Sequence, residues 1–125
     1  MVEVICDTSF LIHLANHRIK NLSTLETEIG DIHFVVSDTV VFELTKLSKQ
    51  KEKSREANAA LQYIKNFKKI QMGGSFADDS FVSYVRENGG VIATIDKALK
   101  YKIKSSGGSV ISIANNRIVL EANRT

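Results

Sequence analysis

The sequence predicts an α/β fold of three layers (α/β/α), with a central, mainly parallel β-sheet between two layers of helices. Short apolar segments of strand length alternate with longer segments whose apolar residues recur every three or four positions, a pattern typical of parallel strands joined by helices. The chain has 125 residues, of which 43% are hydrophobic, and no linker or repeat divides it. We therefore expect a single domain over residues 1–125.

The first half of the chain is expected to supply three strands and the helices between them. Residues 2–6 form an apolar segment closed by Asp7, which predicts a buried strand, and residues 9–15 have the apolar spacing of a helix. The elements expected next are a helix over 21–29 ended by Gly30, a strand over 32–36, a helix capped by Ser37-Asp38-Thr39, a helix over 56–67 and a short edge strand over 69–72 ended by Gly73-Gly74.

The second half is expected to complete the sheet. Helical spacing covers residues 77–88, and Asn88-Gly89-Gly90 ends that helix before an apolar strand over 91–95. The remaining elements are a short basic helix over 97–104, a turn over 105–108, a strand over 109–113, a tight turn at Asn115-Asn116 and an amphipathic segment over 117–121 at a sheet edge.

Composition narrows the class of protein. Lysine and arginine total 17 against 14 aspartate and glutamate, which gives a net charge of +3, too mild an excess to identify a nucleic-acid binder by itself. The single cysteine, Cys6, has no partner in the chain for a disulfide, and we expect it to pack in the core. Because no segment approaches the roughly 18 apolar residues of a membrane span and no secretion segment precedes the first strand, we expect a soluble, cytoplasmic protein.

Carboxylates stand where strands end or helices begin: Asp7 and Asp96 after apolar strands, Glu43 within a helical segment, and Asp78 and Asp79 at the start of another helix. Side chains at the carboxyl ends of parallel strands point into the crevice where such sheets bind ligands. Hard oxygen ligands, without histidines or cysteines at metal-ligand spacing, favour Mg²⁺ or Mn²⁺. If these carboxylates converge, they predict metal-assisted hydrolysis of a phosphodiester.

Each acid also has an ordinary structural role available to it. Aspartate after a strand often caps the next helix, which applies to Asp7 and Asp96, and Asp78 and Asp79 have the positions of an N-cap pair. Glu43 sits among apolar neighbours, although one turn of helix can still place it in water. The residues alone leave both interpretations open.

In order, these segments resemble the PIN-domain ribonucleases over essentially the whole chain. The resemblance rests on Asp-Thr-Ser-Phe-Leu-Ile at 7–12, Phe-Glu-Leu at 42–44, Ala-Asp-Asp-Ser-Phe-Val at 77–82 and Ala-Thr-Ile-Asp at 93–96. Within that family the chain is similar to archaeal stand-alone proteins of the ribosomal-RNA-processing group, with VapC toxins as the nearest competitor. It departs from many relatives in having no proline at the start of the glutamate-bearing helix.

The resemblance implies endonucleolytic hydrolysis of single-stranded RNA in an acidic pocket that binds one or two Mg²⁺ or Mn²⁺ ions. By position, the catalytic and metal-binding acids would be Asp7, Glu43, Asp79 and Asp96. Asp7 and Asp96 would be the principal metal ligands. Glu43 would be a ligand or general base, and Asp79 would bind a second metal or anchor a water molecule. Supporting roles would fall to Thr8, Ser9, Asp78 and Thr94.

Charge and apolar content also suggest partners. Lys46, Lys97 and Lys100 are expected to contact the RNA backbone, although each lysine also fits a solvated helix face. The helices between residues 40 and 67 carry more apolar side chains than one small core is expected to bury, which predicts a homodimer. A toxin would also bind an antitoxin, and a processing enzyme would have a pre-ribosomal partner.

Two other classes of function remain open. A catalytically silent RNA-binding module would bind RNA in a salt-sensitive way that does not need the acids. A receiver-like phosphoacceptor also places aspartates around Mg²⁺, but it normally has an acidic couple after its first strand, where this chain has Asp7 alone.

Overall fold

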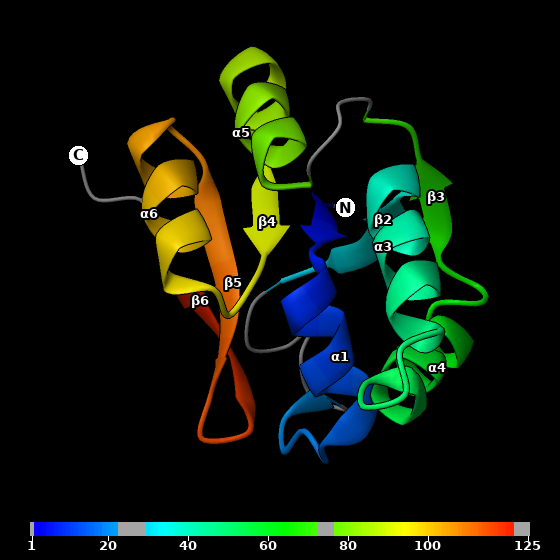
Figure 1. Ribbon diagram of the computed structural model, residues 1–125. Helices are drawn as coiled ribbons and strands as arrows, with labels where there is room; N and C mark the ends of the chain where they lie inside the picture. The colour runs from blue at the N-terminus through cyan, green and yellow to red at the C-terminus, as the bar shows by residue number, and fades with distance from the viewer. Residues whose placement is uncertain (1, 23–29, 73–76, 122–125) are drawn as a thin grey trace.

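The structure, a computed structural model, describes residues 2–22, 30–72 and 77–121, with the backbone alone described at 77 and 78. Its sheet has the order β3-β2-β1-β4-β5-β6 (Figure 1). Every neighbouring pair is parallel except β5 and β6, which form an antiparallel hairpin. The strands are β1 (Val2–Cys6), β2 (Ile32–Ser37), β3 (Lys68–Ile70), β4 (Val91–Ala93), β5 (Ser109–Ala114) and β6 (Arg117–Glu121).

The helices between the strands cover both faces of this sheet. They are α1 (Thr8–Asn16), α3 (Asp38–Ser48), α4 (Ser54–Tyr63), α5 (Ala77–Asn88) and α6 (Lys97–Ser105). Because parallel crossovers are right-handed, the steps from β1 to β3 place α1, α3 and α4 on one face, and the return steps through β4 to β5 place α5 and α6 on the other. Figure 1 shows these two helix groups on opposite sides of the molecule, which confirms the predicted three-layer, mainly parallel fold.

The chain reverses its direction of travel across the sheet at β1. The first crossovers move from β1 to β2 and β3, whereas the next crossover returns to β4 on the other side of β1. Open α/β sheets bind ligands at the carboxyl ends of the strands at such a switch point. The topology therefore predicts a ligand site at the carboxyl ends of β1 and β4.

The central strands are buried on both faces, as expected for a parallel sheet between two helix layers. In β1 the consecutive residues Val4, Ile5 and Cys6 are each at most 2% exposed, although their side chains alternate between the faces. Cys6 is thus a core residue, as predicted. Its neighbours in the core include Phe10 and Leu11 of α1, Val35 and Val36 of β2, Leu44 of α3, Phe81 of α5, Ile92 of β4 and Leu99 of α6.

Several sequence-based boundaries were wrong, and the structure shows the reason for two of them. The helix expected over 56–67 ends at Tyr63, because the chain turns so that Phe67 stacks on Phe34 of β2, with ring centroids 6.4 Å apart, and the Lys69 ammonium donates to carbonyls of residues 64, 65 and 67. The strand expected over 91–95 ends at Ala93, since the next side chain turns to bind Asp7.

Other expected elements lie close to their predicted positions. The edge strand expected over 69–72 is β3, which begins one residue earlier and ends two residues earlier, at Lys68–Ile70; β3 and β6 lie at the two edges of the sheet. Asn115 and Asn116 both have positive φ, 53° and 58°, as a tight hairpin turn requires. Most of the helix expected over 21–29 lies outside the described residues.

The apolar side chains of α3 and α4 are better buried than the sequence suggested. Val40, Leu44, Ala57, Ala60 and Ile64 all lie in the core, each at most 2% exposed. The large apolar side chains exposed on these two helices are Phe42 and Tyr63, which are 66% and 37% exposed. The homodimer stays a prediction, but the apolar surplus on which it was based is smaller than expected.

Gly108 lies in the turn between α6 and β5, where side chains of α5 and α6 pack closely against it. A Cβ atom at this position would lie 2.7 Å from Val85 Cγ1 and 2.9 Å from Ile103 Cγ2, both closer than van der Waals contact. Gly108→Ala should therefore lower the free energy of unfolding by about 1–3 kcal/mol, the cost of overpacking a core. Urea denaturation measures this, and the cost should shrink in the Val85→Ala background, which removes the nearer methyl group. An equal cost in both backgrounds would contradict the steric explanation.

Candidate active site

Four polar residues form a row across the carboxyl edge of the sheet. The register pairs Cys6 with Val36 and with Ala93, and Ala93 with Ile111. The residues that follow on the four strands are Ser37, Asp7, Thr94 and Ser112, and each is at most 5% exposed. A carboxylate thus lies between hydroxyl-bearing residues at the switch point of the sheet.

Asp7 is fixed in orientation by donors from two elements. As the N-cap of α1 it accepts a hydrogen bond from the Phe10 amide to Oδ1, at 2.8 Å. The Ser9 hydroxyl donates to both carboxylate oxygens, at 2.9 and 3.1 Å. The Thr94 hydroxyl donates to Oδ2. Charge-assisted hydrogen bonds of this kind are strong, so this buried carboxylate is held in one geometry.

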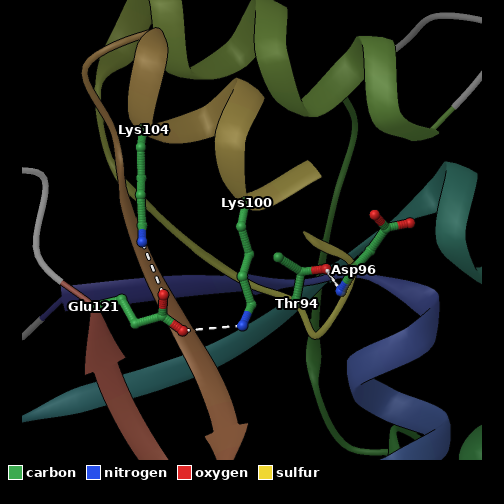
Figure 2. Close-up of polar contacts among 5 residues, drawn as sticks. All are labelled: Thr94, Asp96, Lys100, Lys104 and Glu121. Carbon is green, nitrogen blue, oxygen red and sulfur yellow. Dashed lines mark hydrogen bonds and ion pairs between the residues drawn. The ribbon is translucent and has the colours of Figure 1, made fainter. Parts of the chain in front are cut away.

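Thr94 connects Asp7 to Asp96. Its hydroxyl donates to Asp7 and accepts from the backbone N–H of Asp96, at 3.0 Å. Asp96 is the N-cap of α6 and accepts from the Leu99 amide at 3.1 Å. Figure 2 shows its exposed carboxylate pointing away from the charge network of Lys100 and Glu121. One buried hydroxyl therefore fixes the relative positions of two acids from neighbouring strands.

The other predicted acids lie on helices that begin at the same edge. Glu43 is exposed in the second turn of α3, whose N-cap is Ser37. Asp79 is exposed in the first turn of α5. The side chain of Asp78 lies outside the described residues, so the assignment of the third acid to Asp79 and not to Asp78 stays a prediction. Because helix N-termini carry partial positive charge, this edge favours carboxylates and phosphate groups.

The residues at this edge fit a divalent metal site only in part. Among the side chains in the described part of the chain, no three histidine, cysteine, aspartate or glutamate groups lie close enough to hold a metal ion. The acids at this edge offer only oxygen donors, which suit a hard divalent cation. Two hydroxyls in the described regions, Thr8 Oγ1 and Ser112 Oγ, are buried without a protein hydrogen-bond partner, as groups that bind water or an ion often are.

Some of these residues were missed by sequence reasoning. Ser112 was counted only as part of a strand, although a serine between Ile111 and Ile113 in a buried strand is itself a signal of a special position. The helix-capping interpretation of Asp7 and Asp96 is confirmed, and it is compatible with a second role, because a cap occupies only part of a carboxylate. Thr94 was singled out from the sequence, but its link to both acids required the structure.

Cys6, next to Asp7, has an unreactive thiol. Burial, and secondarily the nearby Asp7 carboxylate, raise the pKa of the Cys6 thiol well above its ordinary value. The thiol therefore stays protonated at neutral pH and is a poor nucleophile. Any chemistry at this edge falls to the acids and hydroxyls.

The three lysines expected to contact RNA lie in different surroundings. Lys46 lies with its ammonium 5.6 Å from the centroid of the Phe42 ring, and Lys97 is exposed in the first turn of α6. Lys100 binds Glu121 of β6 at 3.0 Å, and Lys104 binds the other oxygen of the same carboxylate at 2.8 Å (Figure 2). Lys100 is thus committed to an internal ion pair, which weakens its candidacy as a phosphate contact.

Fold and site together define a doubly wound α/β protein with an acid-and-hydroxyl site at its switch point. The chain matches the model of the PIN like domain family over residues 4–116, and it belongs to that family. It is 31% identical over 123 residues to Ribonuclease VapC4 from Methanocaldococcus jannaschii, an alignment that covers 94% of each protein.

Solved structures give the same result. The chain is similar to the PIN domain endonuclease Utp24, with a TM-score of 0.76 and 29% identity over 96% of this chain and 91% of that one. It also shares its fold with PAE2754 from Pyrobaculum aerophilum, with a TM-score of 0.56 and 19% identity over 87% of this chain and 83% of that one. None of the helices in the described ranges is long and apolar enough to cross a membrane.

Removing the Thr94 hydroxyl should cost stability, because Asp7 loses a donor and the Asp96 amide loses its acceptor in a buried place. We expect Thr94→Val to lower the free energy of unfolding by about 1–3 kcal/mol, and Thr94→Ser, which keeps the hydroxyl, to cost less. Urea denaturation of both variants measures the difference. Equal costs would mean that the methyl group of Thr94, and not its hydroxyl, matters.

The ion pairs of Glu121 make a pH-dependent contribution. Lys104 and then Lys100 hold the pKa of this carboxyl below its ordinary value, so the stabilisation is present above the unfolded-state pKa and is lost as pH falls through the folded-state pKa. Glu121→Gln should destabilise the protein by up to about 1 kcal/mol at neutral pH, and this difference should shrink as pH falls through the folded-state pKa of Glu121. Thermal denaturation over a series of pH values tests this, and a difference that does not shrink in acid would contradict it.

Proposed function

We propose that this protein is a metal-dependent endoribonuclease that hydrolyses phosphodiester bonds of single-stranded RNA. The observation that carries the proposal is the pair of acids, Asp7 and Asp96, joined by Thr94 at the switch point of the sheet. Membership of the PIN like domain family and likeness to a ribonuclease and to a PIN endonuclease support the class of reaction.

Asp7 and Asp96 would hold one or two Mg²⁺ or Mn²⁺ ions, with Asp79 and Glu43 completing the set. When bound, such an ion neutralises the phosphate, lowers the pKa of a water molecule and stabilises the leaving oxygen. Glu43, exposed on α3, would bind metal or accept the proton of the attacking water. Thr94, together with Ser9, keeps the buried carboxylate oriented, and Thr8 and Asp78 have supporting positions beside the acids.

The biological role that we favour is RNA processing or ribosome biogenesis in the cytoplasm. Similarity to the PIN domain endonuclease Utp24 over 96% of this chain supports an endonuclease, and the resemblance of the sequence motifs to the ribosomal-RNA-processing group favours this role. A toxin of the VapC type is the second candidate, favoured by the 31% identity to Ribonuclease VapC4 over almost the whole chain. An antitoxin gene beside this one would identify the toxin, and a pre-ribosomal partner recovered with the protein would identify the processing enzyme.

Replacing Asp96 by asparagine should abolish metal-dependent cleavage, because an amide keeps the size of the side chain but loses its charge. We expect wild-type protein to cut single-stranded RNA with Mn²⁺ or Mg²⁺ but not with EDTA, and Asp96→Asn to be slower by about a hundredfold or more. The matched control is Asp31→Asn, an exposed aspartate at the start of β2, on the opposite edge of the sheet from Asp96, which should retain full activity.

Calorimetric titration with Mn²⁺ in the same samples separates the alternatives. Binding by wild type that is lost in Asp96→Asn supports the metal site independently of substrate. Cleavage that survives in Asp96→Asn or in EDTA contradicts the proposed mechanism. RNA binding without either cleavage or Mn²⁺ binding would favour the catalytically silent module.

A further inference from the structure

A surface groove lies between α5 and α6. It has a volume of about 490 Å³ and opens to solvent. Asp79 and Arg86 line it from α5, and Tyr101 and Lys102 line it from α6, together with serines at the end of α6. Its volume lies in the range of sites for small organic ligands, which includes a base with its sugar and phosphate.

The groove shares one residue, Asp79, with the proposed set of acids. Both helices start at the carboxyl edge of the sheet, because each one precedes or follows β4 in a parallel crossover. Asp79, a proposed metal ligand, is in the first turn of α5, and Arg86 is seven residues further along the same helix. At 1.5 Å per residue this separation is about 10 Å, so a strand leaving the acids along this groove would meet the arginine.

Charge on α6 is divided between two of its faces. Lys100 and Lys104 are bound to Glu121, whereas Lys102 lines the groove. Neither Lys102 nor Arg86 forms a salt bridge with another residue of the described regions. Two cations that face open solvent beside an acidic site suit a polyanion whose scissile group is held by the acids.

Tyr101 adds a feature that charge alone does not explain. Its side chain is 75% exposed, more than any other large apolar side chain in the described part of the chain, and it makes no ring contact there. The exposed Phe42, in contrast, has Lys46 near its ring. An open aromatic ring beside cations is the usual arrangement for stacking the bases of single-stranded nucleic acid.

We propose that the groove between α5 and α6 is the subsite for the nucleotides next to the scissile phosphate, where Tyr101 stacks on a base and Lys102 and Arg86 hold the neighbouring phosphates. This inference rests on the proposed ribonuclease function and specifies where its single-stranded substrate lies. A stacking site reads shape and not base identity, so the subsite should favour single strands over duplexes with little preference for sequence.

Binding is measured without cleavage, by fluorescence anisotropy of a short fluorescein-labelled single-stranded RNA with the full-length protein in EDTA. Tyr101→Leu should weaken binding about tenfold, which corresponds to about 1.4 kcal/mol, and Tyr101→Phe should bind within about twofold of wild type because it keeps the ring. Because Tyr101 is exposed, thermal denaturation should show unchanged stability for both variants.

The lysine is tested by neutralisation with a matched control. Lys102→Gln should weaken binding severalfold and reduce the slope of log affinity against log salt by about 1, as expected for one lost phosphate contact. Lys51→Gln removes the same charge from an exposed residue in the turn between α3 and α4, in the other helix layer, and should change neither quantity.

The outcomes separate this inference from the proposed function. Three results would overturn the proposed RNA subsite in the groove. They are wild-type affinity in both Tyr101→Leu and Lys102→Gln, a loss in Lys51→Gln equal to that in Lys102→Gln, and the absence of RNA binding by the wild-type protein. A groove that instead receives a protein partner would give the first of these results. If binding depends on Tyr101 and Lys102 but Asp96→Asn cuts as fast as wild type, the subsite stands and the proposed catalytic role of the acids fails.

Discussion

The hydrogen bond from Thr94 to the buried carboxylate of Asp7 is the interaction on which the architecture of the site depends. A carboxylate that is only 5% exposed is tolerated when its oxygens are satisfied by strong donors, and here the donors come from α1 and from the segment after β4. The same threonine oxygen accepts the Asp96 amide. The carboxyl ends of two neighbouring strands are thereby joined by polar contacts at the point where apolar core contacts end.

This arrangement also explains why the acids can serve structure and chemistry together. Asp7 and Asp96 each cap a helix through one oxygen, which fixes the backbone where the helix leaves the sheet. Helix N-termini at this edge carry partial positive charge, which favours carboxylates there and would favour the phosphate of the proposed substrate. Packing elsewhere maintains the geometry. Gly108 allows Val85 of α5 and Ile103 of α6 to pack against the turn between α6 and β5, and the ion pairs of Glu121 link α6 to β6.

The lysines on two faces of α6 differ in whether they are bound to a carboxylate. On the face toward β6, α6 uses Lys100 and Lys104 to bind Glu121, so these residues stabilise the fold. On the face toward α5, Lys102 lines an open groove with Tyr101. A count of basic residues cannot separate these roles, because a lysine bound to a carboxylate and a lysine facing solvent contribute equally to net charge. The direction of each side chain from the helix axis decides which one meets a ligand.

The sequence by itself determined the alternation of strands and helices, the edge positions of β3 and β6, and the capping positions of Asp7 and Asp96 before helices, because these follow from local periodicity and capping chemistry. It did not determine where α4 and β4 end, since Phe67 and Thr94 are drawn to distant partners, Phe34 and Asp7. The sequence also did not reveal the row of hydroxyl-bearing residues beside Asp7, the ion pair of Lys100 with Glu121 or the groove that Tyr101 lines. These depend on strand register and helix packing, which bring together residues far apart in the chain, and only the tertiary structure decides them.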